Sequence, residues 1–264
     1  MGNAEWTLQL RRLWRIVALA AVLASLLGTV VIAALGVALW PVKPGSHSVF
    51  QSLLSQHCRM LLQVLGVRVV RDPYRSPDSC APTLYLANHV SYLDILVIAA
   101  QWRTGFLAKS EVGTWPLVGY LARACGTIFV KRNSLLSRAM CIEKILARLE
   151  AGGSMLVFPE GTTSVEGPRK KWRPFFSGAV SAARWAGADL KLLYLDYEGV
   201  SEIAWLGDDA LLPNLWKILG RESTRVRLRE REVPSHRTSA GIRDFRATPR
   251  QMRLWLAESG FNTI

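Results

Sequence analysis

The sequence is poor in the residue types that bind metals or form disulfides, with four cysteines and four histidines among 264 residues. The cysteines Cys58, Cys80, Cys125 and Cys141 show neither close pairing nor metal-ligand spacing, and the histidines are scattered. This distribution argues against a metal site and predicts buried free thiols in a reducing compartment. We expect no metal and no bound cofactor.

Several motifs of common enzyme classes are also missing. The sequence has no G-x-S-x-G turn of a serine hydrolase, no P-loop and no H-E-x-x-H zinc motif. Acidic residues are few, with 20 Asp and Glu against 33 Lys and Arg, for a net charge of +13. Such a basic chain tends to bind nucleic acid, anionic lipid headgroups or an acidic carrier, and charge alone does not distinguish these partners.

A long uncharged stretch occupies residues 16–40, after Arg11, Arg12 and Arg15 and up to Trp40. It is long enough to cross a hydrocarbon core of about 30 Å as a helix. A signal peptide is the alternative, but its apolar core is only roughly 7–15 residues long. We therefore predict a basic tail over residues 1–15 and a transmembrane or re-entrant segment over 16–40.

The next apolar stretch, Phe50 to Val70, contains polar residues and predicts an amphipathic helix on the bilayer or on the domain. We assign residues 41–80 to this amphipathic and linker region and residues 81–264 to the catalytic domain. Within the domain, strands are expected over 83–87, 105–108, 127–130, 155–158 and 190–195, and helices from near Ser91 and over 115–124, 135–150 and 178–185. This alternation predicts an α/β fold with a mixed, largely parallel sheet flanked by helices.

The first candidate for chemistry is the run Asn88-His89-Val90-Ser91-Tyr92-Leu93-Asp94, between an expected strand and helix. A carboxylate at Asp94 can reach one imidazole nitrogen of His89 and make the other nitrogen a general base. Ser91 with Asp94 also forms an S-x-x-D capping box, in which Asp94 would only cap the helix. The two interpretations are compatible, because a well-capped turn would position His89.

Two further runs follow expected strands. Residues 158–164 read Phe-Pro-Glu-Gly-Thr-Thr-Ser, a loop that could bind a polar headgroup or form a hydrophilic turn. Residues 126–132 read Gly-Thr-Ile-Phe-Val-Lys-Arg, where Lys131 and Arg132 could bind phosphate or form a solvated strand end.

Taken in chain order, residues 88–94, 126–132 and 158–164 resemble the N-H-x-x-x-x-D, G-x-x-F-x-x-R and F-P-E-G-T blocks of the 1-acylglycerol-3-phosphate acyltransferase family. Lys109, Glu111, Pro116 and Gly119 match the family's usual run between the first two blocks. The resemblance covers residues 84–183. It implies an acyltransferase that moves a fatty acyl group from acyl-CoA or acyl-carrier protein to the free hydroxyl of a lysolipid, first of all 1-acyl-sn-glycerol-3-phosphate.

The resemblance also implies residue roles. His89 would be the general base and Asp94 its orienting partner. Substrate-binding roles would fall to Gly126, Phe129, Arg132, Glu160, Gly161 and Thr162. The expected partners are the lysolipid, the acyl donor and the bilayer, with no nucleic acid. A membrane-tethered binding protein is the alternative of another class, and it leaves the spacing of His89 and Asp94 unexplained.

Two departures from the family pattern concern the acceptor. Thr163 stands where many phosphatidate-forming members have Arg, although Arg169, Lys170, Lys171 and Arg173 follow and could substitute or contact a carrier. The expected strand over 190–195 lacks the usual Pro, and residues 204–208 and 211–216 look similar to lyso-ornithine lipid acyltransferases. Lyso-ornithine lipid is therefore the second candidate acceptor.

Topology presents a conflict. The early arginines place the amino terminus in the cytoplasm, and one full crossing would then separate the domain from cytoplasmic acyl donors. Either the apolar segment bends back, near Gly28 or Gly36, or the amino tail is translocated. We expect the domain on the cytoplasmic face of the membrane, the inner membrane if the chain is bacterial.

Overall fold

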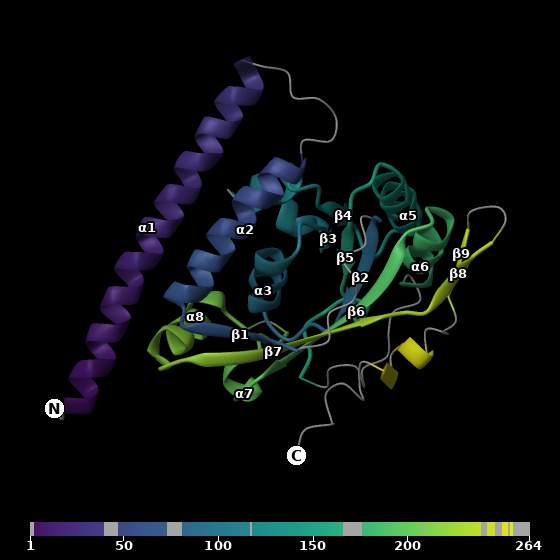
Figure 1. Ribbon diagram of the computed structural model, residues 1–264. Coiled ribbons are helices and arrows are strands. Elements are labelled where there is room, and N and C mark those ends of the chain that lie inside the picture. Colours follow the sequence, from purple (N-terminus) through teal and green to yellow (C-terminus); the bar gives the residue numbers. More distant parts are fainter. Residues whose placement is uncertain are drawn as a thin grey trace.

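The computed structural model describes residues 3–39, 47–72, 81–116, 118–165, 176–207, 209–238, 242–245, 250–252 and 254–255. Its centre is a seven-stranded sheet in the order β1-β7-β6-β2-β5-β3-β4 (Figure 1). The strands are β1 (Val67–Arg71), β2 (Thr83–Ala87), β3 (Gly105–Lys109), β4 (Ile128–Val130), β5 (Met155–Val157), β6 (Asp189–Tyr197) and β7 (Thr224–Glu232). A separate hairpin pairs β8 (Ser235–Arg237) with β9 (Arg243–Phe245).

The helices are α1 (Asn3–Leu39), α2 (His47–Val64), α3 (Leu93–Gln101), α4 (Val118–Ala124), α5 (Leu135–Glu150), α6 (Phe176–Trp185), α7 (Val200–Ile203) and α8 (Leu211–Gly220), with a short 3-10 helix η1 (Ser110–Thr114). Among the described strands, every pairing in the large sheet is parallel except that of β6 with β7. The predicted α/β class with a mixed, largely parallel sheet is therefore confirmed.

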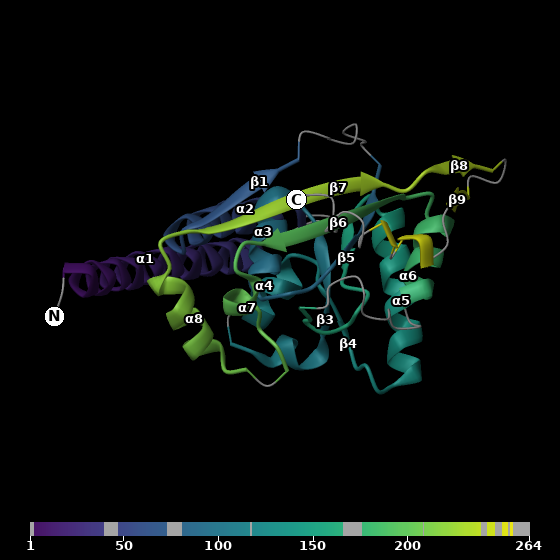
Figure 2. The same ribbon diagram turned by 90° about the horizontal axis from the view of Figure 1, so that it is seen from below.

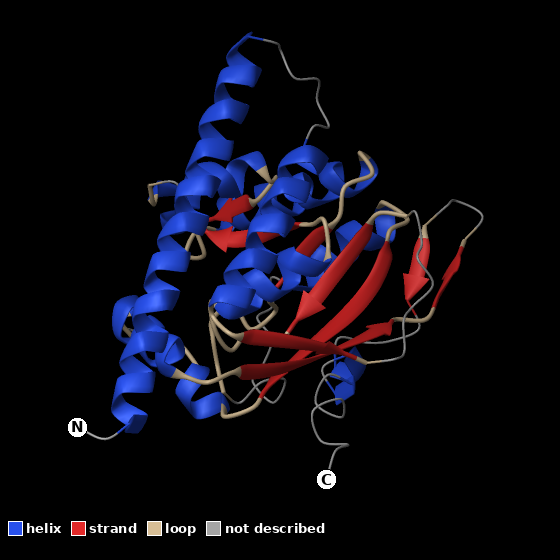
Figure 3. Ribbon diagram, turned by 60° about the vertical axis from the view of Figure 1, so that its left-hand side comes forward, coloured by secondary structure: helices blue, strands red, loops and turns tan. Residues whose placement is uncertain are grey.

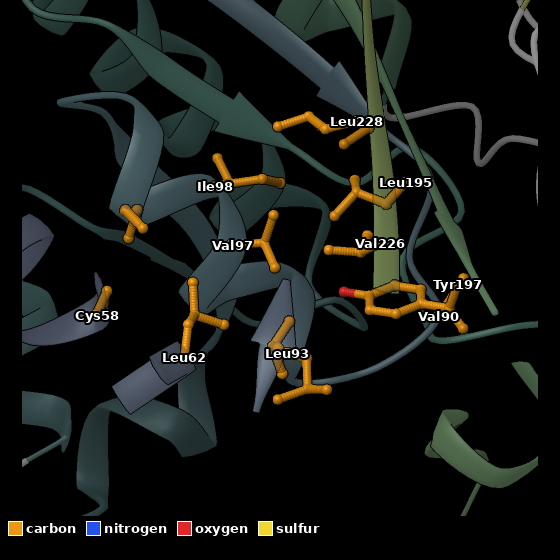
Figure 4. Packing of buried hydrophobic residues seen from close by; sticks show 14 of the residues in the cluster. Cys58, Leu62, Val90, Leu93, Val97, Ile98, Leu195, Tyr197, Val226 and Leu228 are labelled. Atoms are coloured by element: carbon orange, nitrogen blue, oxygen red, sulfur yellow. The ribbon is translucent and has the colours of Figure 1, made fainter. Parts of the chain in front are cut away.

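Helices cover both faces of the sheet (Figures 1 and 2). One core cluster joins α2 and α3 to one face, and Figure 4 shows Val97 and Ile98 of α3 facing Leu195, Val226 and Leu228 of the sheet. A second cluster joins α5 and α6 to the other face of β2, β5 and β6. Helix α1 is the outermost layer and packs on α2 through Val22 and Leu26 (Figure 3).

The predicted helix over Phe50–Val70 is correct only in its first part. Helix α2 ends at Val64, and Val67–Arg71 forms β1, an edge strand paired in parallel with β7. The chain reverses at Gly66, whose φ of +71° is strained for any residue with a Cβ. The polar residues of the run up to Gln63 therefore belong to α2, and the sheet includes a strand from the segment predicted as an amphipathic and linker region.

Helix α1 starts at Asn3, so the residues predicted as a basic tail are helical from that point, and it runs as one helix to Leu39. Of the two alternatives for the topology, this straight helix does not show the bend near Gly28 or Gly36. Trp40 lies outside the described residues. The helix is long and apolar enough to cross a membrane between Glu5 and Val31, by length and composition.

The first turns of α1 are fastened to the end of α8. The guanidinium of Arg15 is buried and donates hydrogen bonds to carbonyls at Leu219 (3.1 Å), Arg221 (2.6 Å) and Glu222 (3.1 Å). Arg11 donates to the Gly220 carbonyl, and Arg12 lies over a Trp ring of α8 at 4.6 Å. The Leu219 and Gly220 carbonyls are orphan acceptors at the C-terminus of α8, and the Arg221 and Glu222 carbonyls directly follow it. We call Arg11, Arg12 and Arg15 the arginine clamp.

Candidate active site

Four neighbouring strands deliver the sequence blocks to one edge of the sheet. Strands β2, β5, β3 and β4 are parallel neighbours, so their carboxyl ends share an edge. His89 follows β2, Glu160 follows β5, η1 follows β3 and Arg132 follows β4. Carboxyl ends of parallel strands are where α/β folds build their sites.

His89 and Asp94 form the pair that the spacing predicted. Nδ1 of His89 lies 2.8 Å from Oδ2 of Asp94, whose side chain is fully buried. A carboxylate accepts, so Nδ1 is the donor of this contact and Nε2 is the ring nitrogen left for another partner. The His89 side chain is 16 % exposed, so its ring can be reached from outside. This arrangement provides an oriented base at the sheet edge.

The capping box of Ser91 and Asp94 is only partly formed. Helix α3 has Tyr92 as its N-cap, without a side-chain cap bond, and the Ser91 hydroxyl accepts the Leu93 N–H at 3.4 Å. Oδ2 of Asp94 accepts the backbone N–H of Val90 at 2.6 Å and that of Ser91 at 2.9 Å. One carboxylate therefore holds both the helix start and the imidazole. Any movement of the turn would move the base.

Two further residues hold this turn against β6: Tyr197, which the sequence analysis missed, and Asn88, which it placed in the first run without a role. The hydroxyl of Tyr197 donates to Oδ1 of Asp94 at 2.7 Å. The amide of Asn88 donates to the Leu195 carbonyl at 2.9 Å and accepts its N–H at 2.8 Å. Burial and the adjacent Asp94 raise the pKa of Tyr197 well above its usual value, so the phenol stays a neutral donor. A tyrosine at the end of an otherwise apolar strand is the sequence signal that could have identified Tyr197.

The F-P-E-G-T block packs directly on the His89 turn. The ring of Phe158 stacks on His89 with 3.9 Å between centroids, and the Ser164 N–H donates to the His89 carbonyl at 2.8 Å. Gly161 turns the loop with φ +70°, Glu160 is buried, and Thr162 is partly exposed. The structure thus brings the N-H-x-x-x-x-D and F-P-E-G-T blocks together. The basic residues 169–173 lie outside the described residues.

The G-x-x-F-x-x-R block, residues 126–132, lies farther along the same edge. Gly126 has φ +80° and ends the turn after α4, while Phe129 packs under the guanidinium of Arg123 at 5.4 Å. Arg132 is exposed in the turn after β4, with β5 and β3 between β4 and the strand that leads to His89. The three inter-strand steps from β2 to β4 amount to roughly 14 Å. Arg132 therefore lies well away from His89 along the same edge of the sheet.

The three cysteines that the structure describes lie outside this site. Cys58, Cys125 and Cys141 are free and buried, as predicted, and burial raises the pKa of Cys58 and of Cys125 to about 12. Cys80 lies outside the described residues. Among the described residues, no cluster of His, Cys, Asp and Glu could hold a metal ion.

The fold and site together define an α/β protein with a carboxylate-held histidine at the carboxyl edge of its sheet. Residues 68–192 match the family model described as Acyltransferase. The chain is 33% identical over 188 residues to the lyso-ornithine lipid O-acyltransferase of Brucella abortus, covering 65% of this chain and 68% of that protein. The chain therefore belongs to the acyltransferase family.

Other relatives carry two kinds of name. The lyso-ornithine lipid O-acyltransferase of Pseudomonas aeruginosa is 36% identical over 159 residues, covering 58% of this chain and 60% of that protein's length. The 1-acyl-sn-glycerol-3-phosphate acyltransferase of Neisseria meningitidis is 31% identical over 173 residues, covering 62% and 64%. The crystal structure of the 1-acyl-sn-glycerophosphate (LPA) acyltransferase of Thermotoga maritima shares the fold, with a TM-score of 0.64, 17% identity and coverage of 97% of this chain and 94% of that one.

Proposed function

We propose that this protein transfers a fatty acyl group from a thioester donor to the free hydroxyl of a lysolipid. Nε2 of His89 takes the proton of the hydroxyl as its oxygen attacks the thioester carbonyl carbon. The carbon–sulfur bond then breaks, the thiol leaves with the proton returned by His89, and an ester remains. The donor is acyl-CoA or acyl-carrier protein. The single observation that carries this proposal is the 2.8 Å contact of His89 with Asp94.

The surroundings of Asp94 support a base rather than a structural histidine. Asp94 accepts from two backbone N–H groups, from Tyr197 and from His89, and it is fully buried. Such a carboxylate orients the imidazole and, in the proposed mechanism, stabilises the imidazolium that forms during proton transfer. The side chain of His89 is 16 % exposed, which leaves its ring within reach of a substrate.

The acceptor is one of two lysolipids. 1-Acyl-sn-glycerol-3-phosphate fits the exposed Arg132 beyond β4, because a guanidinium binds phosphate through two parallel hydrogen bonds. Lyso-ornithine lipid fits Thr163, which replaces a frequent Arg, and the names of several relatives. Both acceptors present a free hydroxyl to His89.

We also propose that the domain lies on the cytoplasmic face with α1 buried along its outward side in the bilayer. The arginine clamp fixes the start of α1 to the domain, and the outward side chains of α1 are apolar, with Leu13, Trp14 and Val17 about 60 % exposed. The arginine clamp holds the start of α1 to the domain, and α1 packs on α2 farther along. Its polar contacts therefore face the protein. This placement keeps His89 on the side of the acyl donors.

An acyl-transfer assay tests the proposal. The detergent-solubilised chain is incubated with oleoyl-CoA or oleoyl carrier protein and a panel of lysolipids, and products are identified by mass spectrometry. We expect a new ester on at least one lysolipid, abolished in His89→Ala. Binding of lysolipid without any ester product would favour the membrane-tethered binding protein instead.

A further inference from the structure

The three most exposed large apolar side chains among the described residues belong to the domain and not to α1. Leu135 and Leu136, in the first turn of α5, are 76 % and 71 % exposed, and Leu212, in the first turn of α8, is 75 % exposed. A single exposed leucine is common on protein surfaces, so the place of these three relative to the candidate site decides what they mean.

All three leucines lie on the side of the sheet that carries the candidate active site. Helix α5 begins after the carboxyl end of β4, and α7 and α8 follow the carboxyl end of β6. Both strands run in the same direction as β2, the strand that leads to His89. Figure 2 shows the start of α5 and α8 on the same, lower side of the molecule. The leucines therefore flank the edge to which His89 belongs.

Partly exposed aromatic side chains continue this surface between the leucines. Trp115 and Tyr120, in the segment after β3, and Trp216, in α8, are each a little under half exposed. Tryptophan and tyrosine, with an apolar body and a polar tip, favour the boundary between membrane and water. The guanidinium of Arg12 lies over Trp216 at 4.6 Å, so the surface continues into α1. We call the six side chains the apolar rim: Trp115, Tyr120, Leu135, Leu136, Leu212 and Trp216.

The segments that carry the apolar rim are basic. Residues 114–142 and 210–221 contain no Asp or Glu, and their cations are Arg123, Lys131, Arg132, Arg138, Lys217 and Arg221. Anionic phospholipid headgroups attract such cations, while apolar side chains beside them enter the acyl boundary. A protein partner is a poorer fit, because the centre of a protein interface is a continuous patch with few charges. Leucines on separate segments with cations between them fit a fluid lipid layer.

We propose that the apolar rim docks on an anionic bilayer, with Leu135, Leu136 and Leu212 inserted at the acyl boundary and the cations at the headgroups. This contact turns the carboxyl edge of the sheet toward the lipid. A lysolipid then reaches His89 by moving sideways out of the bilayer, without crossing water. Helix α1 supplies the attachment, and the apolar rim supplies the orientation. The inference rests on the proposed acyl transfer for its use of a lysolipid.

A kinetic test compares an acceptor held in the bilayer with one dissolved in water. The full chain is reconstituted in phosphatidylglycerol–phosphatidylcholine vesicles and assayed with 1-oleoyl- or with water-soluble 1-hexanoyl-sn-glycerol-3-phosphate. The rim variant is Leu135→Gln/Leu136→Gln/Leu212→Gln. The matched control is Val70→Gln/Trp185→Gln, which replaces exposed apolar side chains in β1 and at the end of α6, away from the catalytic edge.

In the rim variant, KM for the oleoyl acceptor should rise by about tenfold or more, because bilayer contact scales with the apolar area inserted. Turnover of the hexanoyl acceptor should change little, since it reaches the site from water. The control variant should behave as the unmodified chain with both acceptors. An equal loss with both acceptors, or an unchanged KM for the oleoyl acceptor, would overturn the inference.

A depth measurement separates this inference from the proposed function, because it needs no turnover. A fluorophore is attached at Leu136→Cys or, as the control, at Trp185→Cys, in a Cys80→Ser chain whose other cysteines are buried. Lipids with a nitroxide on the acyl chain should quench the label at position 136, and aqueous iodide should quench the label at position 185. This result supports the docking surface even if no lysolipid is acylated. Quenching of both labels by iodide alone would show that the apolar rim faces water.

Discussion

The hydroxyl of Tyr197, at the end of β6, donates a 2.7 Å hydrogen bond to the carboxylate of Asp94 in the first turn of α3, 103 positions earlier in the chain. The ring of Tyr197 lies in the core between α3 and the sheet (Figure 4). Tyr197 therefore fixes the oxygen of Asp94 that does not face His89. It acts on the base through Asp94, as a positioning residue.

Replacing Tyr197 by Phe should lower kcat by about tenfold and leave KM for the acceptor nearly unchanged. The change leaves a buried carboxylate oxygen without its donor, which should also lower the free energy of unfolding by about 1–3 kcal/mol. The Nδ1–H resonance of His89 in the proton NMR spectrum should shift. Tyr85→Phe, on the same face of the neighbouring β2, is the control. A stability loss of this size with normal kcat and an unmoved resonance would make Tyr197 structural only.

His89→Ala should lower turnover by about two orders of magnitude or more, because general-base catalysis contributes about 10²–10⁴-fold. Asp94→Asn should also be severe, since an amide can favour the wrong imidazole tautomer. The double variant should be little worse than His89→Ala, because residues that act as a unit are not additive. Steady-state kinetics measure these effects, with circular dichroism to confirm folding. Near-normal turnover in a folded His89→Ala would refute the catalytic assignment.

Arg132→Ala tests whether the G-x-x-F-x-x-R block binds the phosphate of the acceptor. With lysophosphatidate as acceptor, KM should rise by about tenfold or more while kcat changes little, because a bidentate contact to phosphate is lost. Lys131→Ala, which removes the neighbouring charge, should have a smaller effect because an ammonium is a point charge. A rise in KM that is the same for lyso-ornithine lipid would show that Arg132 does not read the phosphate.

Membrane attachment should survive a high-salt wash. Salt at 1 M shortens the screening length to about 3 Å but leaves apolar burial intact. Leu13→Glu/Val17→Glu places two charges on the exposed side of α1 and should convert the protein to a salt-released form. Sedimentation and immunoblotting of the washed membranes measure both. Release of the unmodified, intact protein by salt alone would leave electrostatics as its only attachment.

The buried thiols should resist alkylation at pH 8. Burial raises the pKa of Cys58 and Cys125 to about 12, so almost no thiolate is present, whereas unfolded thiols ionise near their usual pKa of 9.0. Because the native state then binds more protons, stability should fall as pH rises above about 9. Iodoacetamide labelling followed by mass spectrometry should modify these sites only after denaturation. Rapid labelling of the native chain would show that the core opens.

The sequence blocks predicted the site where the contacts are local. His89 and Asp94 lie five positions apart, so one turn decides their geometry, and the predicted strands and helices around them match β2 to α6 closely. The missed features depend on distant partners. Strand β1 is defined by β7, and Tyr197 gains its role from Asp94. Residues 224–232 alternate arginines with other residues, which is the period of a strand, and the sequence analysis made no prediction for them.

The arginine clamp sets an order for biosynthesis. It joins Arg15 to carbonyls that lie 203 to 207 positions later in the chain. At roughly 5–20 residues per second, a ribosome makes the partner carbonyls about 10–40 s after Arg15. Helix α1 is thus available to the bilayer long before its partner exists. If α1 enters the bilayer as proposed, the domain docks onto a helix that is already in the lipid, and a chain terminated before residue 218 would be inserted but never docked.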